Sequence, residues 1–130
     1  SLAESEKVFT SGKDLIVEVD VQGAIQIMEL IDPISIFILP PSFELLQARL
    51  TSRGTEDDTG LATRLRNAFE EVLEYPRFKF VVINDDISNA SRQIASIILA
   101  ERQTVDRQTD AIRVILNSFD ASRHRFEENS

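Results

Sequence analysis

Hydrophobic residues along this chain recur with two spacings, and the spacing changes several times between the first residue and the last. Where apolar side chains run together, as in DLIVEVD and ISIFIL, the pattern is typical of strands. Where they return every three or four positions, it is typical of amphipathic helices. The pattern predicts strands over 14–20, 34–39 and 78–84, and helices over 2–10, 22–31, 43–52, 59–74 and 88–119.

Strands that alternate with helices predict βαβ units and a parallel sheet. The segment 34–39 is apolar almost throughout, which is typical of a strand covered on both faces. We therefore expect an α/β fold with a small, about three-stranded parallel sheet. The last helical pattern would be about 48 Å long as one helix, so we expect a break within 103–110 and a frayed end over 123–130.

Polar residues and helix breakers mark where the elements begin and end. Candidate N-caps are Ser42, Asp58 or Thr59, and Asp85 or Asp86, and candidate breakers are Gly12, Gly54 and Pro76.

The composition narrows the class of protein. The 130 residues amount to one domain, and the net charge of −8 argues against a partner that is nucleic acid or an acidic membrane. The absence of cysteine excludes disulfides and thiol chemistry and favours a reducing, cytoplasmic location. The chain begins at Ser1 without a basic and then apolar leader, so we expect no signal peptide and expect further chain to precede it.

Polar residues follow the predicted strands at the edge where open parallel sheets bind ligands. Glu18 and Asp20 end the first strand, and positions i and i+2 share a face, so we expect two carboxylates that point together. Such a pair suits Mg²⁺-bound water or the N–H groups of a base, although an exposed strand face is the more ordinary explanation. The third strand ends in Asn84, Asp85 and Asp86, of which a helix cap accounts for one acid.

An acidic chain here gathers four arginines within 18 residues: Arg49, Arg53, Arg64 and Arg66. The first two are one helical turn apart, and the loop 54–58 that follows them resembles a lid between two arginine-bearing helices. A guanidinium group matches phosphate oxygens and can stack on a base. The alternative is a surface network of ion pairs between these arginines and the neighbouring carboxylates, which contributes little to stability. Arg66 is assigned to that network.

Two apparent motifs carry no chemistry. Gly12-Lys13 is not the end of a P-loop, because no G-x-x-x-x-G-K-[ST] exists in this sequence and the pair precedes a strand; we expect a turn. His124, the single histidine, lies in a polar tail, which excludes a Ser-His-Asp arrangement.

Taken together, these segments resemble the C-terminal half of guanylate kinase. The matching segments are VEVDVQGA (17–24), SIFILPPS (35–42), RLTSRGTED (49–57), TRL (63–65) and VINDD (82–86). The resemblance extends from about residue 1 to residue 102. It implies part of a P-loop kinase core over 1–103, with a helical lid at about 53–64 and a helical C-terminal extension over 104–130.

The resemblance also implies an activity, the transfer of the γ-phosphate of ATP to GMP, which gives ADP and GDP in purine nucleotide metabolism. It implies Mg²⁺ that is bound with ATP and not held by a dedicated protein site in this chain. It places Arg49, Asn84 and Asp85 at ATP, Arg53 and Arg64 at the transferring phosphate, and Asp20 and Glu18 at GMP. Glu18 stands where the family usually has aspartate.

The most important departure from the family is that the P-loop and most of the GMP-binding segment have no counterpart in these residues. We therefore expect a fragment, or part of a longer chain, that is inactive alone. One alternative is a non-catalytic guanylate-kinase-like module that binds protein ligands; such modules tend to lose the arginines and the Asn-Asp pair kept here. Another is a kinase for a different nucleoside monophosphate.

The C-terminal region permits one further partner. Val105, Ile112 and Phe119 repeat every seven residues, so an apolar stripe could pack on the domain or pair with a second copy. Packing within the chain and a homo-oligomer through this helix both stay open.

Overall fold

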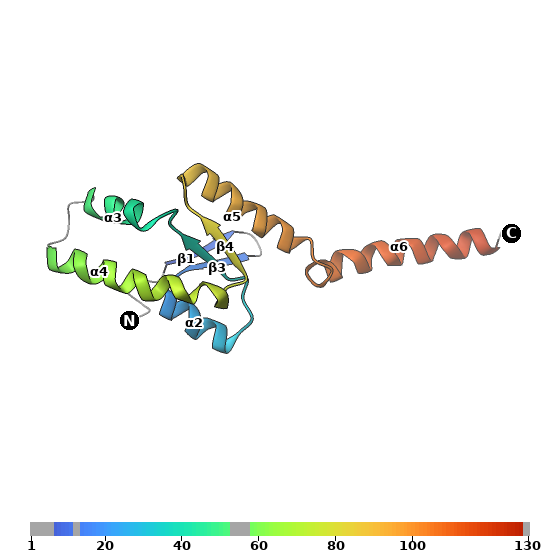
Figure 1. Ribbon diagram of the computed structural model, residues 1–130. Coiled ribbons are helices and arrows are strands. Elements are labelled where there is room, and N and C mark those ends of the chain that lie inside the picture. The colour runs from blue at the N-terminus through green and yellow to red at the C-terminus, as the bar shows by residue number, and fades with distance from the viewer. Residues whose placement is uncertain (1–6, 12–13, 53–57, 129–130) are drawn as a thin grey trace. The chain divides into compact units, whose positions relative to one another are not determined.

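The computed structural model describes residues 7–11, 14–52 and 58–128, which form a mixed α/β structure (Figure 1). The elements are β1 (Lys7–Ser11), β2 (Asp14–Glu18), α2 (Val21–Leu30), β3 (Ile36–Leu39), α3 (Phe43–Ser52), α4 (Asp58–Glu71), η1 (Val72–Arg77), β4 (Phe80–Ile83), α5 (Ile87–Arg102), η2 (Asp106–Gln108) and α6 (Thr109–Glu128). The chain divides into two compact units, Ser1–Ala90 and Ser91–Ser130. We describe each unit separately.

The first unit holds two small sheets instead of one. β3 and β4 pair in parallel, with Ile36 opposite Phe80 and Leu39 opposite Ile83, which confirms the predicted parallel pairing of these strands. β2 does not join them, because it pairs with β1 in an antiparallel sheet. The expected three-stranded parallel sheet was therefore wrong for the described residues.

The expected helix over 2–10 was also wrong where the structure describes it. Residues 7–11 form β1, whose register places Val8 opposite Val17 and Phe9 opposite Ile16. β-branched and aromatic residues in this stretch suit a strand, and a partner only a few residues away in the chain costs little loop entropy. The predicted turn at Gly12-Lys13 lies outside the described residues.

Side-chain caps define the helix starts in this unit. Asp20 Oδ1 accepts a hydrogen bond from Gly23 N at 2.7 Å, and Ser42 Oγ accepts one from Leu45 N at 3.1 Å. The cap predicted for Ser42 is thereby confirmed. α4 ends at Glu71, three residues earlier than predicted, and continues as the 3₁₀ helix η1 that contains Pro76.

Among the described side chains, three apolar ones are buried: Phe37, Val82 and Ala90. Phe37 and Val82 lie on opposite faces of the β3–β4 sheet, and the ring of Phe78 meets Phe37 edge-on with centroids 5.0 Å apart. The prediction that β3 is covered on both faces was wrong in part, because Ile38 is 52% exposed.

The second unit is helical. The predicted break within 103–110 is confirmed, since α5 ends at Arg102 and α6 begins at Thr109 after η2. The expected fraying over 123–130 was wrong as far as Glu128, because α6 continues to that residue. In the part of the chain that the structure describes, no helix combines the length and the apolar character needed to cross a membrane.

Candidate functional site

The carboxyl ends of β3 and β4 lie together at one edge of the parallel sheet. Asn84 N donates a hydrogen bond to Leu39 O at 2.9 Å, which joins the two strand ends one residue beyond the last ladder pair. The chain then enters α3 from β3 and α5 from β4. The helix starts and the residues before them are thereby brought to one edge, where open α/β sheets bind their ligands.

Arg49 connects α3 to the end of β4. Its Nη1 donates to Asn84 O at 3.0 Å, and its Nη2 donates to Asp85 O at 3.2 Å. The planar guanidinium group therefore bridges two successive backbone carbonyls of a segment 35 residues further along the chain. Three residues that the sequence placed in two separate motifs are in contact.

The segment after β4 is held by its own side chains. Asp86 Oδ1 accepts from Asn89 N at 2.9 Å and so caps α5, while Asp85 Oδ1 accepts from Asp86 N at 2.7 Å. Of the two predicted caps, Asp86 is the one that binds the helix start.

Asn84 differs from Asp85 and Asp86 in the hydrogen bonding of its side chain. Its side-chain Oδ1 is buried and has no hydrogen-bond partner among the described atoms. A buried acceptor without a partner costs free energy of folding. A ligand N–H group or a water molecule that donates to this oxygen would remove that cost.

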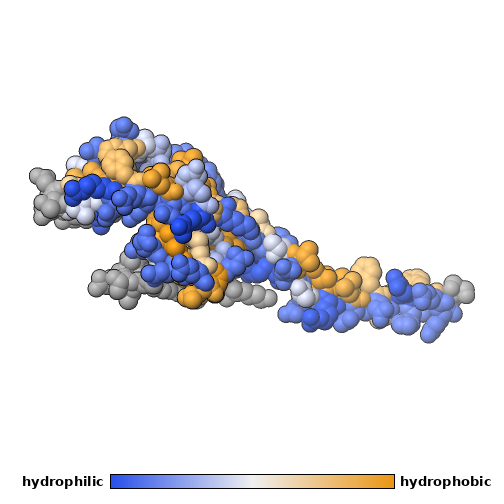
Figure 2. Space-filling view, turned by 60° about the horizontal axis from the view of Figure 1, so that its bottom comes forward, coloured by the Kyte–Doolittle hydropathy of each residue, from blue (hydrophilic) through white to orange (hydrophobic). Residues whose placement is uncertain are grey.

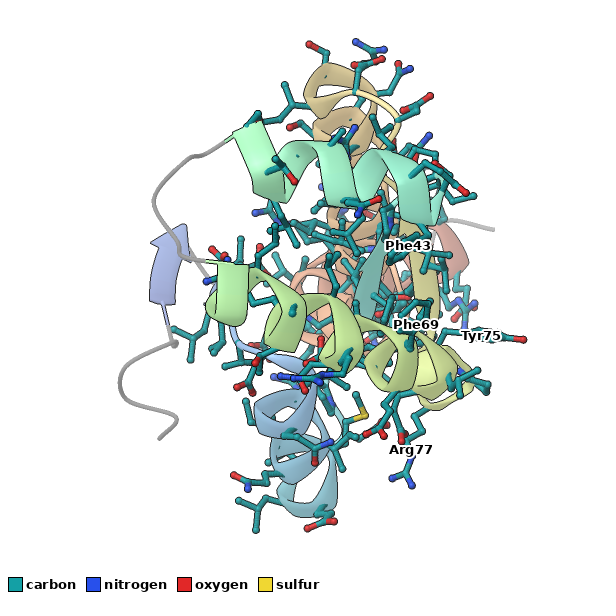
Figure 3. The ribbon with its side chains drawn as sticks, turned by 60° about the vertical axis from the view of Figure 1, so that its left-hand side comes forward. Phe43, Phe69, Tyr75 and Arg77 are labelled. Carbon is teal, nitrogen blue, oxygen red and sulfur yellow. The ribbon has the colours of Figure 1, made fainter. Side chains whose placement is uncertain are left out.

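Of the remaining arginines, Arg64 and Arg66 lie in α4. Arg64 is exposed, whereas Arg53 lies outside the described residues, as do residues 54–57 of the predicted lid; residues 58–64 of that lid form the start of α4. Phe43 of α3 stacks on Phe69 of α4, with ring centroids 4.9 Å apart and planes at 21° (Figure 3). This contact makes the helices that carry Arg49 and Arg64 neighbours.

The predicted acidic pair is divided between a strand and a helix cap. Glu18 is the last residue of β2 and is exposed, whereas Asp20 lies beyond the strand and caps α2. The strand rule that predicted a shared direction therefore does not extend to Asp20.

Glu71, at the end of α4, is a residue that sequence reasoning missed. Partial burial raises the pKa of Glu71, and the charge of the Asp20 carboxylate raises it further. The two residues are 51 positions apart (71 minus 20), so no local spacing signals their proximity.

A hollow of the first unit lies at the other end of the sheet. A cavity of about 330 Å³ is lined by residues that precede the strands, among them Ser35, Arg77 and Lys79. Because open parallel sheets bind ligands at the carboxyl ends of their strands, the residues around Arg49 are the better candidate site. Within the described residues, no group of three or more His, Cys, Asp or Glu could hold a metal ion.

The fold and the site together define a mixed α/β domain with an arginine fixed at the carboxyl edge of a parallel strand pair. The family model for guanylate kinase matches residues 1–101. The chain is 43% identical over 107 residues to a guanylate kinase of Clostridium tetani, a match that covers 82% of this chain. The chain belongs to the guanylate kinase family.

Guanylate kinases from other organisms match this chain with similar identity and coverage. The chain is 41% identical over 105 residues to a guanylate kinase of Caldanaerobacter subterraneus, covering 80% of this chain and 51% of the relative. It is 38% identical over 114 residues to one of Saccharophagus degradans, covering 87% and 56%. The Clostridium tetani match also covers 51% of the relative, so the chain spans about half the length of the curated relatives it matches.

Proposed function

We propose that this protein serves as guanylate kinase, transferring the γ-phosphoryl group of ATP to GMP. The single observation that carries the proposal is the match of residues 1–101 to the guanylate kinase family. The bond between the γ-phosphorus and the bridging oxygen breaks, a phosphate oxygen of GMP bonds to that phosphorus, and ADP and GDP are released. Such reactions depend mainly on positioning and charge stabilisation.

ATP is proposed to lie with its adenine on Arg49. The two hydrogen bonds to backbone carbonyls hold the guanidinium plane in one orientation, which suits stacking of a base on its face. The buried Oδ1 of Asn84 offers an acceptor for an N–H donor of the same base. Asp85 completes this end of the ATP site.

Arg64 and Arg53 are proposed to bind the transferring phosphoryl group. Charge spreads over its oxygens during transfer, and a guanidinium group in contact with them lowers the barrier. Mg²⁺ comes with ATP, held by phosphate oxygens and water, as is usual for this ion.

GMP is proposed to meet the acidic residues Asp20 and Glu18. Carboxylate oxygens accept hydrogen bonds from the ring N–H and amino group of guanine. Asp20 already accepts one bond, from Gly23 N, but a carboxylate has about four lone-pair positions and retains capacity.

The 130 residues alone are proposed to be inactive, since they contain no G-x-x-x-x-G-K-[ST] motif to hold the ATP phosphates. The test joins this chain to the half of the Clostridium tetani relative that lies outside their match, and measures ADP formation. We expect GMP-dependent activity from the joined protein, little with AMP, CMP or UMP, and none from the chain alone.

Each other outcome points to a different conclusion. Equal activity with another monophosphate would assign the protein to a different nucleoside-monophosphate kinase. A well-folded joined protein that binds peptides and forms no ADP would indicate the interaction module. Activity of the chain alone would refute the proposed need for a second half.

A further inference from the structure

The hollow of about 330 Å³ at the amino ends of β3 and β4 lies at the opposite end of these strands from the proposed nucleotide site. The end of α2 forms one side of it, and the residues between η1 and β4 form the other. Pockets for small molecules in proteins have volumes of about 300–1,000 Å³, so this hollow suits a small ligand. The proposed phosphoryl transfer uses none of the residues that line it.

Part of the wall of the hollow is apolar. Met28 and Ile31 come from the end of α2, Pro33 comes from the connection to β3, and Phe78 follows η1. The ring of Phe78 meets the buried Phe37 edge-on, with centroids 5.0 Å apart, which holds the ring in place. Such a wall suits an aliphatic or aromatic group of a ligand.

The side of the hollow next to β4 carries positive charge. Arg77, which Figure 3 shows beside α2, pairs through Nε with Glu74 at 2.6 Å, so its two Nη atoms can donate to a further acceptor. Ser35 Oγ accepts a hydrogen bond from Lys79 N at 2.9 Å and can still donate its own hydrogen. Lys79 supplies a second positive charge. This side therefore suits a carboxylate, which a guanidinium group binds with two parallel hydrogen bonds.

The side formed by the end of α2 carries negative charge. Asp32 lines the hollow directly after the helix and forms no ion pair with any described residue. The carbonyl groups in the last turn of a helix carry partial negative charge, and α2 has no basic residue there to offset it. This side therefore suits an ammonium group.

We propose that this hollow binds a free α-amino acid with an apolar side chain. The carboxylate binds Arg77 and Ser35, the ammonium group binds Asp32 and the end of α2, and the side chain contacts Met28 and Phe78. A simple anion fits less well, because its charge would be repelled by Asp32. The site lies away from the proposed nucleotide site, so the proposal goes beyond the proposed function and does not depend on it.

The experiment titrates the isotope-labelled chain with L-leucine and follows the backbone amide resonances. We expect saturable shifts at Ser35, Phe78 and Lys79, half-complete at about 1 mM because the charged groups are in contact with solvent. Three probes each lack one recognised group: glycine lacks the side chain, isocaproate the ammonium group and isoamylamine the carboxylate. Each should bind more weakly by about fivefold or more.

Two variants assign the charged contacts. In Arg77→Gln, leucine should bind no better than isoamylamine, because the partner of the carboxylate is gone. In Asp32→Asn, leucine should bind no better than isocaproate. Arg113→Gln on α6 is the matched control, since Arg113 is exposed and does not line the hollow, and it should bind leucine normally. All three side chains are exposed, so the variants should fold, which their amide spectra check.

The same titrations on the chain joined to the unmatched half of the Clostridium tetani relative should give the same order of affinities. Loss of the shifts there would show that the other half fills the hollow, and would overturn the proposal. No saturable shift up to about 50 mM leucine, or equal binding of leucine, isocaproate and isoamylamine, would overturn it as well. Failure to form ADP would count only against the proposed function.

Discussion

The unit Ser1–Ala90 and the unit Ser91–Ser130 differ in how their apolar residues are used. The first buries Phe37 and Val82 within a sheet and fixes Arg49 at the sheet's carboxyl edge. In the second, α6 has no buried residue along its 20 residues, and Phe119 and Phe126 are 72% and 76% exposed. Figure 2 shows hydrophobic side chains at the surface of this helix alongside hydrophilic ones.

The difference between the two units coincides approximately with the end of the family match. The match ends at residue 101, and the site residues all precede that point, whereas α6 lies beyond it. A helix in water gains most of its stability by packing an apolar face, and α6 repeats Ile112, Phe119 and Phe126 every seven residues. The chemistry is therefore proposed for the first unit, and α6 is available for packing within the chain or for a second copy.

The largest contrast between the units should appear in catalysis. In the joined protein, Arg64→Ala is expected to lower kcat by about 10³-fold or more, because a charge that stabilises the transferring phosphoryl group is lost. Arg113→Ala on α6 should leave kcat within about twofold, since Arg113 lies beyond the family match and forms an exposed ion pair with Asp110 at 3.3 Å. Initial ADP-release rates at saturating ATP and GMP measure both. A loss below tenfold for Arg64→Ala would exclude the proposed role.

A valine-to-alanine substitution should change the free energy of unfolding by different amounts in the two units. Val82→Ala is expected to lower the free energy of unfolding by about 2 kcal/mol, because a nearly fully buried side chain is truncated. Val114→Ala, at a side chain that is 70% exposed, should change it by less than about 0.5 kcal/mol. Urea unfolding of the chain measures both, and equal effects would contradict the difference in burial.

Removing an arginine side chain should also cost different amounts of stability in the two units. Arg49→Ala is expected to cost about 1 kcal/mol of stability, because the carbonyls of Asn84 and Asp85 lose a charged donor. Arg49→Lys should recover little, since one ammonium group does not reproduce the fork that bridges both carbonyls. Arg113→Ala serves as the exposed control. The thermal midpoint of the chain without nucleotide reports all three.

The smallest effect is expected at Glu71. Its folded pKa lies above the ordinary value of 4.5, so between the two values the folded state binds more protons than the unfolded state. Stability therefore falls as the pH rises through that interval and stays lower above it. Glu71→Gln should stabilise the chain at neutral pH by less than about 0.5 kcal/mol, after allowance for screening by solvent.

The pH dependence provides the check on Glu71. The advantage of Glu71→Gln should shrink as the pH is lowered toward and below 4.5, because the unsubstituted carboxyl becomes protonated as well. Glu127→Gln on α6 is the control, because Glu127 pairs with Arg123 at 3.8 Å and its loss should not stabilise. Thermal melts in steps from pH 7.5 downward would contradict the assignment if the advantage stayed constant.

Elements with strong local signals could be predicted from the sequence. Helix α3 has the predicted bounds, Ser42 and Asp86 are the predicted caps, and β3 and β4 pair in parallel. Local capping determines where these helices begin, and an apolar run between helices indicates a parallel strand even though its partner lies 44 positions away (80 minus 36).

Features that depend on distant partners were not predictable. β1 forms because β2 is beside it, although its residues also fit a helical pattern. The hydrogen bonds of Arg49 to Asn84 and Asp85, and the effect of the Asp20 charge on the pKa of Glu71, connect residues far apart in the chain. Resemblance to a family suggested the residues around Arg49, but no residue spacing suggested Glu71.

Within the described part of the chain, the outer edges of β3 and β4 have no strand partner, which has a consequence for handling the protein. Unpaired strands offer a template for other copies, and the net charge of −8 keeps copies apart at neutral pH. Near the isoelectric point of about 4.6 that repulsion vanishes while the edges stay open. Precipitation by edge-to-edge association should therefore be fastest there, and slower once another protein segment occupies the edge.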